Sequence, residues 1–171
     1  ERFIEYKFDK AFDVYKELLH KYPHDMQAIS MLSLYAIFRG GWKKILAIFD
    51  DILEHNTDNI GFLTYFMFYL HLADDPRAVA YWDKLKIMAP EEPFVHHSGA
   101  HILSMKYSVD EAIEYLESVS KYWSSGSTYS IIHNWLHLGV LYAWRGDGET
   151  ALSVYSQFVW ANFKEQTFTQ M

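Results

Sequence analysis

The chain has 171 residues, of which 50% are hydrophobic and 18% aromatic, and 15 Lys and Arg against 22 Asp and Glu give it a net charge of −7. This length fits one domain with a continuous core, and the aromatic content excludes a largely disordered chain. The acidic balance argues against a nucleic-acid surface, because phosphate contacts need concentrated cations, and it favours a neutral or basic protein partner. No cysteine is present, so disulfides and thiolate metal sites are excluded.

We find no targeting signal in the N-terminal residues and no membrane span in the most apolar segment. Glu1 to Glu5 contain acidic residues and lack the pattern of a cleaved leader. The apolar run 60–73 includes Thr64 and His71 and is shorter than the roughly 20 residues of a membrane span. We therefore expect a buried helix here, no membrane span, and a cytoplasmic location by default.

A small or aliphatic side chain followed four and seven residues later by two larger apolar ones recurs at an interval of about 34 residues, which is a helical-repeat period. The recurring trios are Ala11, Tyr15 and Leu18; Ile45, Phe49 and Ile52; Ala78, Trp82 and Leu85; Ala112, Leu116 and Val119; and Ala151, Tyr155 and Phe158. The last interval is longer, and its excess falls in the polar run 124–128, which we expect to be a loop. Each of the last four trios follows another apolar helix across a tight turn, so the pattern predicts antiparallel helix pairs.

The last repeat carries the strongest motif. Its residues are Trp135, Leu138, Gly139, Tyr142, Gly146, Asp147, Ala151 and Tyr155, and they resemble the tetratricopeptide repeat consensus. In such a pair Gly139 and Ala151 would allow close helix approach, and Gly146 would supply the turn. We predict an all-α fold, a tetratricopeptide-type α-solenoid of antiparallel helix pairs that forms a right-handed superhelix.

We expect a single repeat domain over residues 1–171. Its repeats would span about 1–25 (partial), 26–58, 59–92, 93–123 and 131–163. The chain opens inside a second helix and shows no polar capping helix, so we expect a fragment of a longer chain that meets the rest of that chain or an assembly.

Certain first-helix positions line the concave surface in proteins that the chain resembles. The residues at these positions are Gln27, Ser30, Leu34, Ile60, Leu63, Met67, Phe94, His97, His101, His133, Leu136 and Val140. We call them the candidate groove residues. None is Lys or Arg, so an apolar helix or strand is a better ligand than a peptide carboxylate. The alternative is that these apolar positions belong to the core.

Two histidine pairs stand out, His97 with His101 and His133 with His137. The i, i+4 spacing places both rings of a pair on one helix face, and neighbouring helix axes about 8–10 Å apart would bring the pairs together. Three roles remain open, namely structural hydrogen bonding, a transition-metal site for an ion such as zinc or iron, and a pH-sensing cluster.

The segments around these histidines resemble one particular family more closely than the general tetratricopeptide consensus. They are Val95, His97 to Ile102, Met105-Lys106, Trp123, His133 to His137, Gly146-Asp147 and Ala151 to Tyr155. They resemble the tetratricopeptide repeat protein 38 family over about 94–160, with departures at Leu136 and Ser156. The resemblance implies a helical solenoid and lends no reaction, ligand or catalytic residue.

Three functions fit these patterns. The first is a scaffold or adaptor that binds a peptide or helix in the concave groove. The second is a metal-binding protein or metal-dependent enzyme that uses the paired histidines, and the third is a structural subunit of a larger assembly. No phosphate loop, nucleophile elbow or H-E-x-x-H motif occurs, so we expect no catalytic residue, and no cofactor unless the histidines hold a metal.

Overall fold

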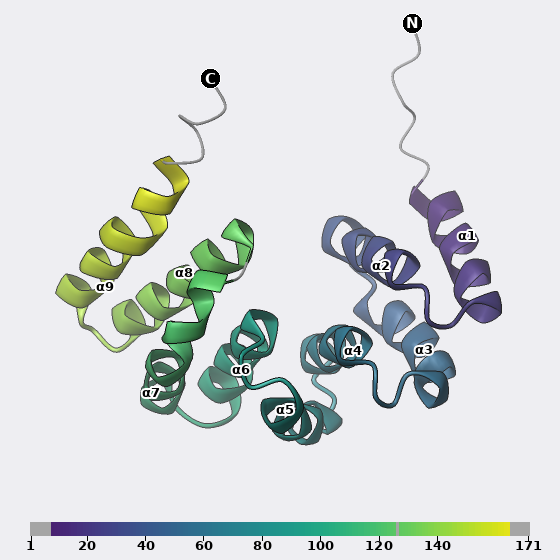
Figure 1. The fold of residues 1–171 in the computed structure, drawn as a ribbon, viewed down its shortest axis with the longest axis horizontal. Coiled ribbons are helices and arrows are strands. Elements are labelled where there is room, and N and C mark those ends of the chain that lie inside the picture. Colours follow the sequence, from purple (N-terminus) through teal and green to yellow (C-terminus); the bar gives the residue numbers. More distant parts are fainter. Residues whose placement is uncertain (1–7, 126, 165–171) are drawn as a thin grey trace, which may run out of the picture. The chain divides into compact units, whose positions relative to one another are not determined.

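The computed structural model describes residues 8–125 and 127–164, and every regular element in these ranges is helical (Figure 1). The α-helices are α1 (Phe8–Lys21), α2 (Met26–Arg39), α3 (Trp42–Ile52), α4 (Ile60–Leu72), α5 (Arg77–Met88), α6 (Pro93–Lys106), α7 (Val109–Val119), α8 (Thr128–Trp144) and α9 (Gly148–Val154). Two short 3-10 segments, η1 (Leu53–His55) and η2 (Ser120–Ser125), and a π-helical segment, η3 (Tyr155–Trp160), extend three of them. The predicted all-α class is confirmed. Within the described ranges, no helix has both the length and the apolar character needed to cross a membrane.

The chain divides into two compact units, Glu1–Tyr81 and Trp82–Met171, with the boundary inside α5. In the first unit α2 packs on α1, α3 and α4, and α3 packs on α1 and α4. In the second unit α6 packs on α7 and α8, while α8 also packs on α7, α9 and η3. Successive helices within each unit run antiparallel (Figure 1), which are the helix pairs that the repeat predicted.

Polar residues cap the start of several helices, both at the beginning of a repeat and after the turn inside one. The side chains of Asp25, Asn59, Ser108 and Asp147 each accept a hydrogen bond from a backbone N–H in the first turn of the helix that follows. Such caps satisfy N–H groups that have no partner inside the helix. The turn before Asp147 uses Gly146 at φ 90°, a left-handed conformation that glycine adopts without strain, as the consensus predicted.

The loop expected at 124–128 is shorter than the sequence suggested. The 3-10 segment η2 continues to Ser125, and α8 begins at Thr128 with Ser127 as its cap. Fully buried Trp123 anchors η2; its ring lies edge-on to Trp135 with centroids 4.7 Å apart. Trp123 immediately precedes the polar run, and burial of its large ring fixes η2 against α8 despite the polar character of its neighbours.

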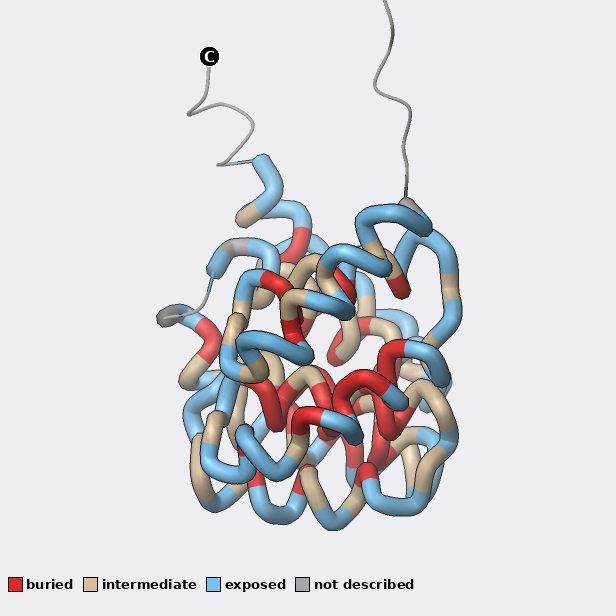
Figure 2. Tube along the Cα trace, turned by 90° about the vertical axis from the view of Figure 1, so that its right-hand side faces the viewer, coloured by how far each residue is buried: buried red, intermediate tan, exposed pale blue. Residues whose placement is uncertain are grey.

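Aromatic side chains fill the core of the first unit. Phe49 of α3 lies 5.4 Å from the Phe62 ring and 5.6 Å from the Tyr69 ring of α4. The Tyr69 hydroxyl donates a hydrogen bond of 3.1 Å to the backbone oxygen of Ser33 on α2, and burial raises the Tyr69 pKa to about 12. Figure 2 shows buried segments where helices pack on one another and exposed turns between them.

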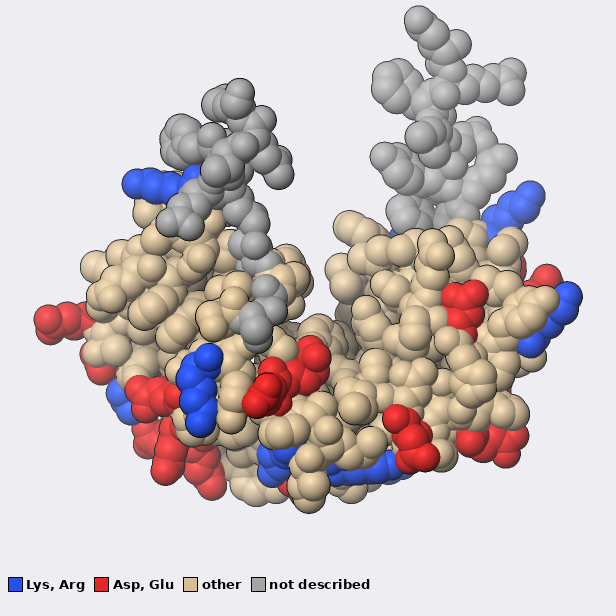
Figure 3. Space-filling view, in the orientation of Figure 1, with Lys and Arg blue, Asp and Glu red and all other residues tan. Residues whose placement is uncertain are grey.

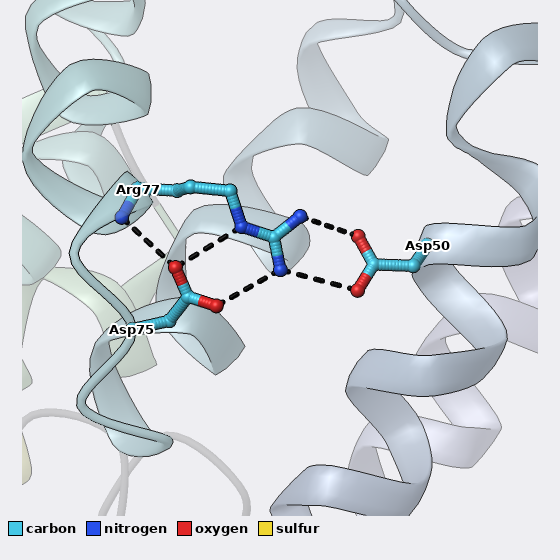
Figure 4. A network of polar contacts seen from close by, with 3 residues as sticks. All are labelled: Asp50, Asp75 and Arg77. Atoms are coloured by element: carbon cyan, nitrogen blue, oxygen red, sulfur yellow. Dashed lines mark hydrogen bonds and ion pairs between the residues drawn. The ribbon is translucent and has the colours of Figure 1, made fainter.

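An ion-pair network joins α3 to the start of α5 in the first unit (Figure 4). The two terminal nitrogens of Arg77 donate to the two carboxylate oxygens of Asp50 at 2.7 and 3.1 Å. Asp75, in the turn before α5, accepts from Arg77 Nε at 3.0 Å and from Arg77 Nη2 at 2.9 Å. The forked guanidinium thus contacts two carboxylates, a geometry that lysine cannot reproduce.

Candidate functional site

The structure places the candidate groove residues on α2, α4, α6 and α8. In the first unit Gln27, Leu34 and Ile60 are exposed and Ser30 is half-buried, whereas Leu63 and Met67 are 0% exposed. Those two side chains therefore occupy the core, the role that helical spacing of apolar residues also allowed. In the second unit Leu136 is exposed, His97 is buried, and the remaining members, which are Phe94, His101, His133 and Val140, are half-buried.

The four paired histidines lie together between α6 and α8 in the second unit, and we call them the histidine cluster. The ring centroids of His97 lie 4.8 Å from His101, 4.6 Å from His133 and 4.8 Å from His137. His137 in turn lies 4.5 Å from His101 and 4.7 Å from His133. Imidazoles from two helices that belong to different repeats thus form one compact group.

Helix rotation decides which histidine joins the cluster. His96 and His97 are adjacent, so their side chains leave α6 about 100° apart. His96 points into the core, where its Nδ1 accepts a hydrogen bond of 3.1 Å from Trp123 Nε1 and its Nε2 lies 2.9 Å from the Pro90 oxygen. These partners assign the neutral form with the proton on Nε2, and burial lowers the His96 pKa. His96 is therefore a structural histidine, and His97 faces α8.

Burial keeps part of the cluster uncharged. The pKa of His133 is lowered by desolvation. The pKa of His137 is lowered to about 3, first by desolvation and then by the charges of His101 and His133. Both rings are consequently neutral at pH 7, and a neutral imidazole is the form that offers a lone pair to a metal ion.

Hydrogen bonds inside the cluster leave a buried nitrogen unmatched. His97 Nε2 and His101 Nε2 are 3.2 Å apart, and His133 Nδ1 is 3.0 Å from the Tyr129 hydroxyl one turn earlier on α8. His137 Nε2 is buried and has no hydrogen-bond partner among the described residues. Leaving such a group unsatisfied costs about 1–3 kcal/mol, so this nitrogen points to a ligand.

Three members of the cluster meet a spacing that suits metal coordination. His97, His133 and His137 each offer one ring nitrogen, and these nitrogens all lie within 4.8 Å of one another. The sequence identified all four histidines from their spacing. It gave no indication of the supporting Tyr129, although this residue is placed i, i+4 before His133 on the same helix face.

A second feature, an apolar hollow beside the cluster helix α8, had not been expected from the sequence. Its volume is about 180 Å³, and its lining includes Leu136, Val140, Ala143, Ala151, Tyr155 and Val159. Two of these, Leu136 and Val140, are candidate groove residues, and the others come from the end of α8, from α9 and from η3. The signal that could have located it is the alternation of small Gly139, Ala143 and Ala151 with large side chains across one helix pair.

Comparison with solved structures supports the fold. No protein-family profile matches the sequence. TTC0263, described as a thermophilic TPR (tetratricopeptide repeat) protein in Thermus thermophilus, is similar with a TM-score of 0.64 and 16% identity over 88% of this chain and 81% of that one. YrrB, described as a TPR protein with an unusual peptide-binding site, is similar with a TM-score of 0.55 and 16% identity over 88% of this chain and 75% of that one. The chain therefore has the tetratricopeptide-type fold of paired helices.

Proposed function

We propose that this chain is a protein-interaction scaffold that binds an apolar polypeptide segment on the α8–α9 side of its second unit. The observation that carries the proposal is the apolar hollow, because it contains two candidate groove residues and has room for a large side chain. An aromatic or aliphatic anchor on a partner would fill about 180 Å³, and burial of such an anchor stabilises a complex by roughly 1.5–3 kcal/mol.

The surface chemistry supports a partner with apolar anchors and a neutral or basic remainder. Leu136 is 41% exposed at the hollow, and Tyr155 at its other side is 43% exposed. On the face seen in Figure 3, uncharged side chains cover most of each unit. The net charge of −7 disfavours an acidic partner, since like charges repel at long range.

The first unit also has exposed apolar side chains on the first helix of a repeat, α2. Leu34 on α2 is 41% exposed and Ile37, one turn further, is 59% exposed. Their i, i+3 spacing presents both on one helix face. YrrB, whose description names a peptide-binding site, supports the general role for a fold of this kind. We infer in addition a distant kinship with the tetratricopeptide repeat protein 38 family, which rests on the histidine-containing segments alone.

The proposal can be tested with a randomised peptide library displayed on phage and selected against the purified chain. We expect enriched peptides with Leu, Ile, Phe or Trp anchors and few acidic residues. Fluorescence anisotropy of a labelled enriched peptide should then show binding that Leu136→Asp weakens at least tenfold, because a charge would be buried against the anchor.

The matched control is Ile87→Asp. Ile87 is 83% exposed on α5, within the same unit and outside the candidate groove, so this variant makes the same chemical change on a surface with no proposed role. Full affinity in Leu136→Asp, or an equal loss in both variants, would contradict the proposed site. The same change at Leu63, another candidate groove residue, would not test binding, since Leu63 is fully buried and the charge would disrupt folding.

A further inference from the structure

The histidine cluster has a composition that a purely structural role does not explain. Four imidazoles are gathered between α6 and α8, and one of their nitrogens, His137 Nε2, is buried without a hydrogen-bond partner among the described residues. Ordinary packing would place apolar side chains here, because a polar ring costs free energy when buried unless each nitrogen is satisfied. A ligand shared by the rings would satisfy them together.

The donor set identifies the class of ligand. Imidazole nitrogen suits zinc, copper, iron and nickel ions, whereas magnesium, calcium and manganese prefer carboxylate and carbonyl oxygens. The candidate donors in this cluster are all ring nitrogens. They belong to two i, i+4 pairs, the arrangement by which a helix presents two nitrogens to one ion.

One nitrogen–nitrogen distance fits tetrahedral coordination, and the others are close enough for ring rotation to reach it. Two nitrogens that each lie about 2.0–2.1 Å from a tetrahedral zinc ion are separated by about 3.3 Å. The Nε2 atoms of His97 and His101 are 3.2 Å apart, which already matches this separation. The nitrogens of His97, His133 and His137 lie within 4.8 Å of one another, so rotation of the α8 rings toward the centre would close the site.

We infer that His97, His101, His133 and His137 together bind one divalent late first-row transition-metal ion, represented by Zn²⁺, and that this ion joins α6 to α8. A site with four protein ligands is closed, which is the form of structural zinc centres. Tyr129 supports it from outside, because its hydroxyl contacts Nδ1 of His133 and so fixes the orientation of that ring. The ion couples two consecutive repeats next to the surface proposed to bind a partner, yet the two proposals rest on different residues.

The test uses the whole chain without an affinity tag, stripped of metal and titrated with Zn²⁺ against a chromophoric chelator. We expect one ion per chain. Loss of an outer-shell partner alone costs about 10- to 100-fold in metal affinity, so His97→Gln, His101→Gln and His137→Gln should each weaken binding at least tenfold. Glutamine keeps a polar side chain of similar size, and far-UV circular dichroism checks that each variant remains helical.

His20→Gln is the matched control, because His20 is exposed on α1 in the other unit; it should bind Zn²⁺ as the unaltered chain does. Zn²⁺ should also raise the unfolding temperature of the unaltered chain and of this control, but not that of the cluster variants, since only a folded site gains from the ion. Stoichiometric binding of Co²⁺ with the intense visible bands of tetrahedral coordination would further support the proposal. Absence of tight Zn²⁺ binding, or unchanged affinity in any of the three cluster variants, would overturn it.

Discussion

Two helical glycines of the second unit should respond in opposite ways to the same substitution. Gly99 on α6 and Gly139 on α8 both stand where the repeat consensus places small residues. A Cβ at Gly99 would lie 2.6 Å from Trp82 Nε1 and 2.7 Å from Tyr115 Cε1. A Cβ at Gly139 would lie 3.6 Å from the Ala151 carbonyl oxygen and 3.7 Å from Val154 Cγ1, which are ordinary contacts.

The magnitudes follow from these distances. Alanine gains about 0.8–1.0 kcal/mol over glycine within a helix, and overpacking a filled core costs about 1–3 kcal/mol. The Trp82 and Tyr115 rings cannot yield easily, because they lie edge-on with centroids 5.3 Å apart and Trp82 is buried. Gly99→Ala should therefore lower the free energy of unfolding by about 1 kcal/mol, while Gly139→Ala should raise it by roughly 0.5–1 kcal/mol.

Urea unfolding followed by far-UV circular dichroism measures both variants against the unaltered chain. Both changes act on the same unit, so the comparison does not depend on how the two units unfold relative to each other. If the variants keep the same m-value, which is the slope of the unfolding free energy against urea concentration, the shift of the midpoint reports a change in stability. The reasoning is refuted if Gly99→Ala is at least as stable as the unaltered chain, or if Gly139→Ala is the less stable of the two.

Two further predictions concern an ion pair and a buried tyrosine of the first unit. Asp50→Ala should destabilise the chain by about 0.5–1 kcal/mol, because a forked ion pair is lost but both of its side chains are partly exposed and screened. Asp83→Ala, which removes an i, i+3 pair with half-buried Lys86 in the second unit, should cost close to nothing, and equal losses in the urea assay would contradict this ranking. The pKa of Tyr69 is raised from 10.0 to about 12 by burial, so the folded state favours the neutral phenol. Its contribution to stability is complete below pH 10 and is lost as the pH rises toward 12. Tyr69→Phe should flatten the alkaline loss of unfolding temperature, and an unchanged alkaline profile would count against the assignment.

Sequence periodicity located most of the helix pairs because it reports local chemistry. Cap residues such as Asp147, the glycine turn at Gly146 and the recurrence of small and large side chains act within one or two turns of helix, so they can be read without a partner. The same holds for the histidine pairs, whose spacing fixes their common face on each helix. These features depend only on residues close together in the sequence, and the tetratricopeptide-type fold follows from them.

The rotation of each helix about its axis and the burial of its side chains cannot be read from the sequence in this way, because they depend on which helix lies opposite. A period of 3.6 residues relates faces within a helix but does not say which face meets a neighbour, so the core position of His96 and the inward position of His97 appear only in the folded unit. Burial of Leu63 and Met67, the tight contact at Gly99 and the looser one at Gly139 have the same origin. The sequence by itself determined the repeat, the helices and the histidine pairs, whereas the tertiary structure alone decided that four imidazoles share one site, because only packing of α6 on α8 brings side chains so distant along the chain within a few ångströms.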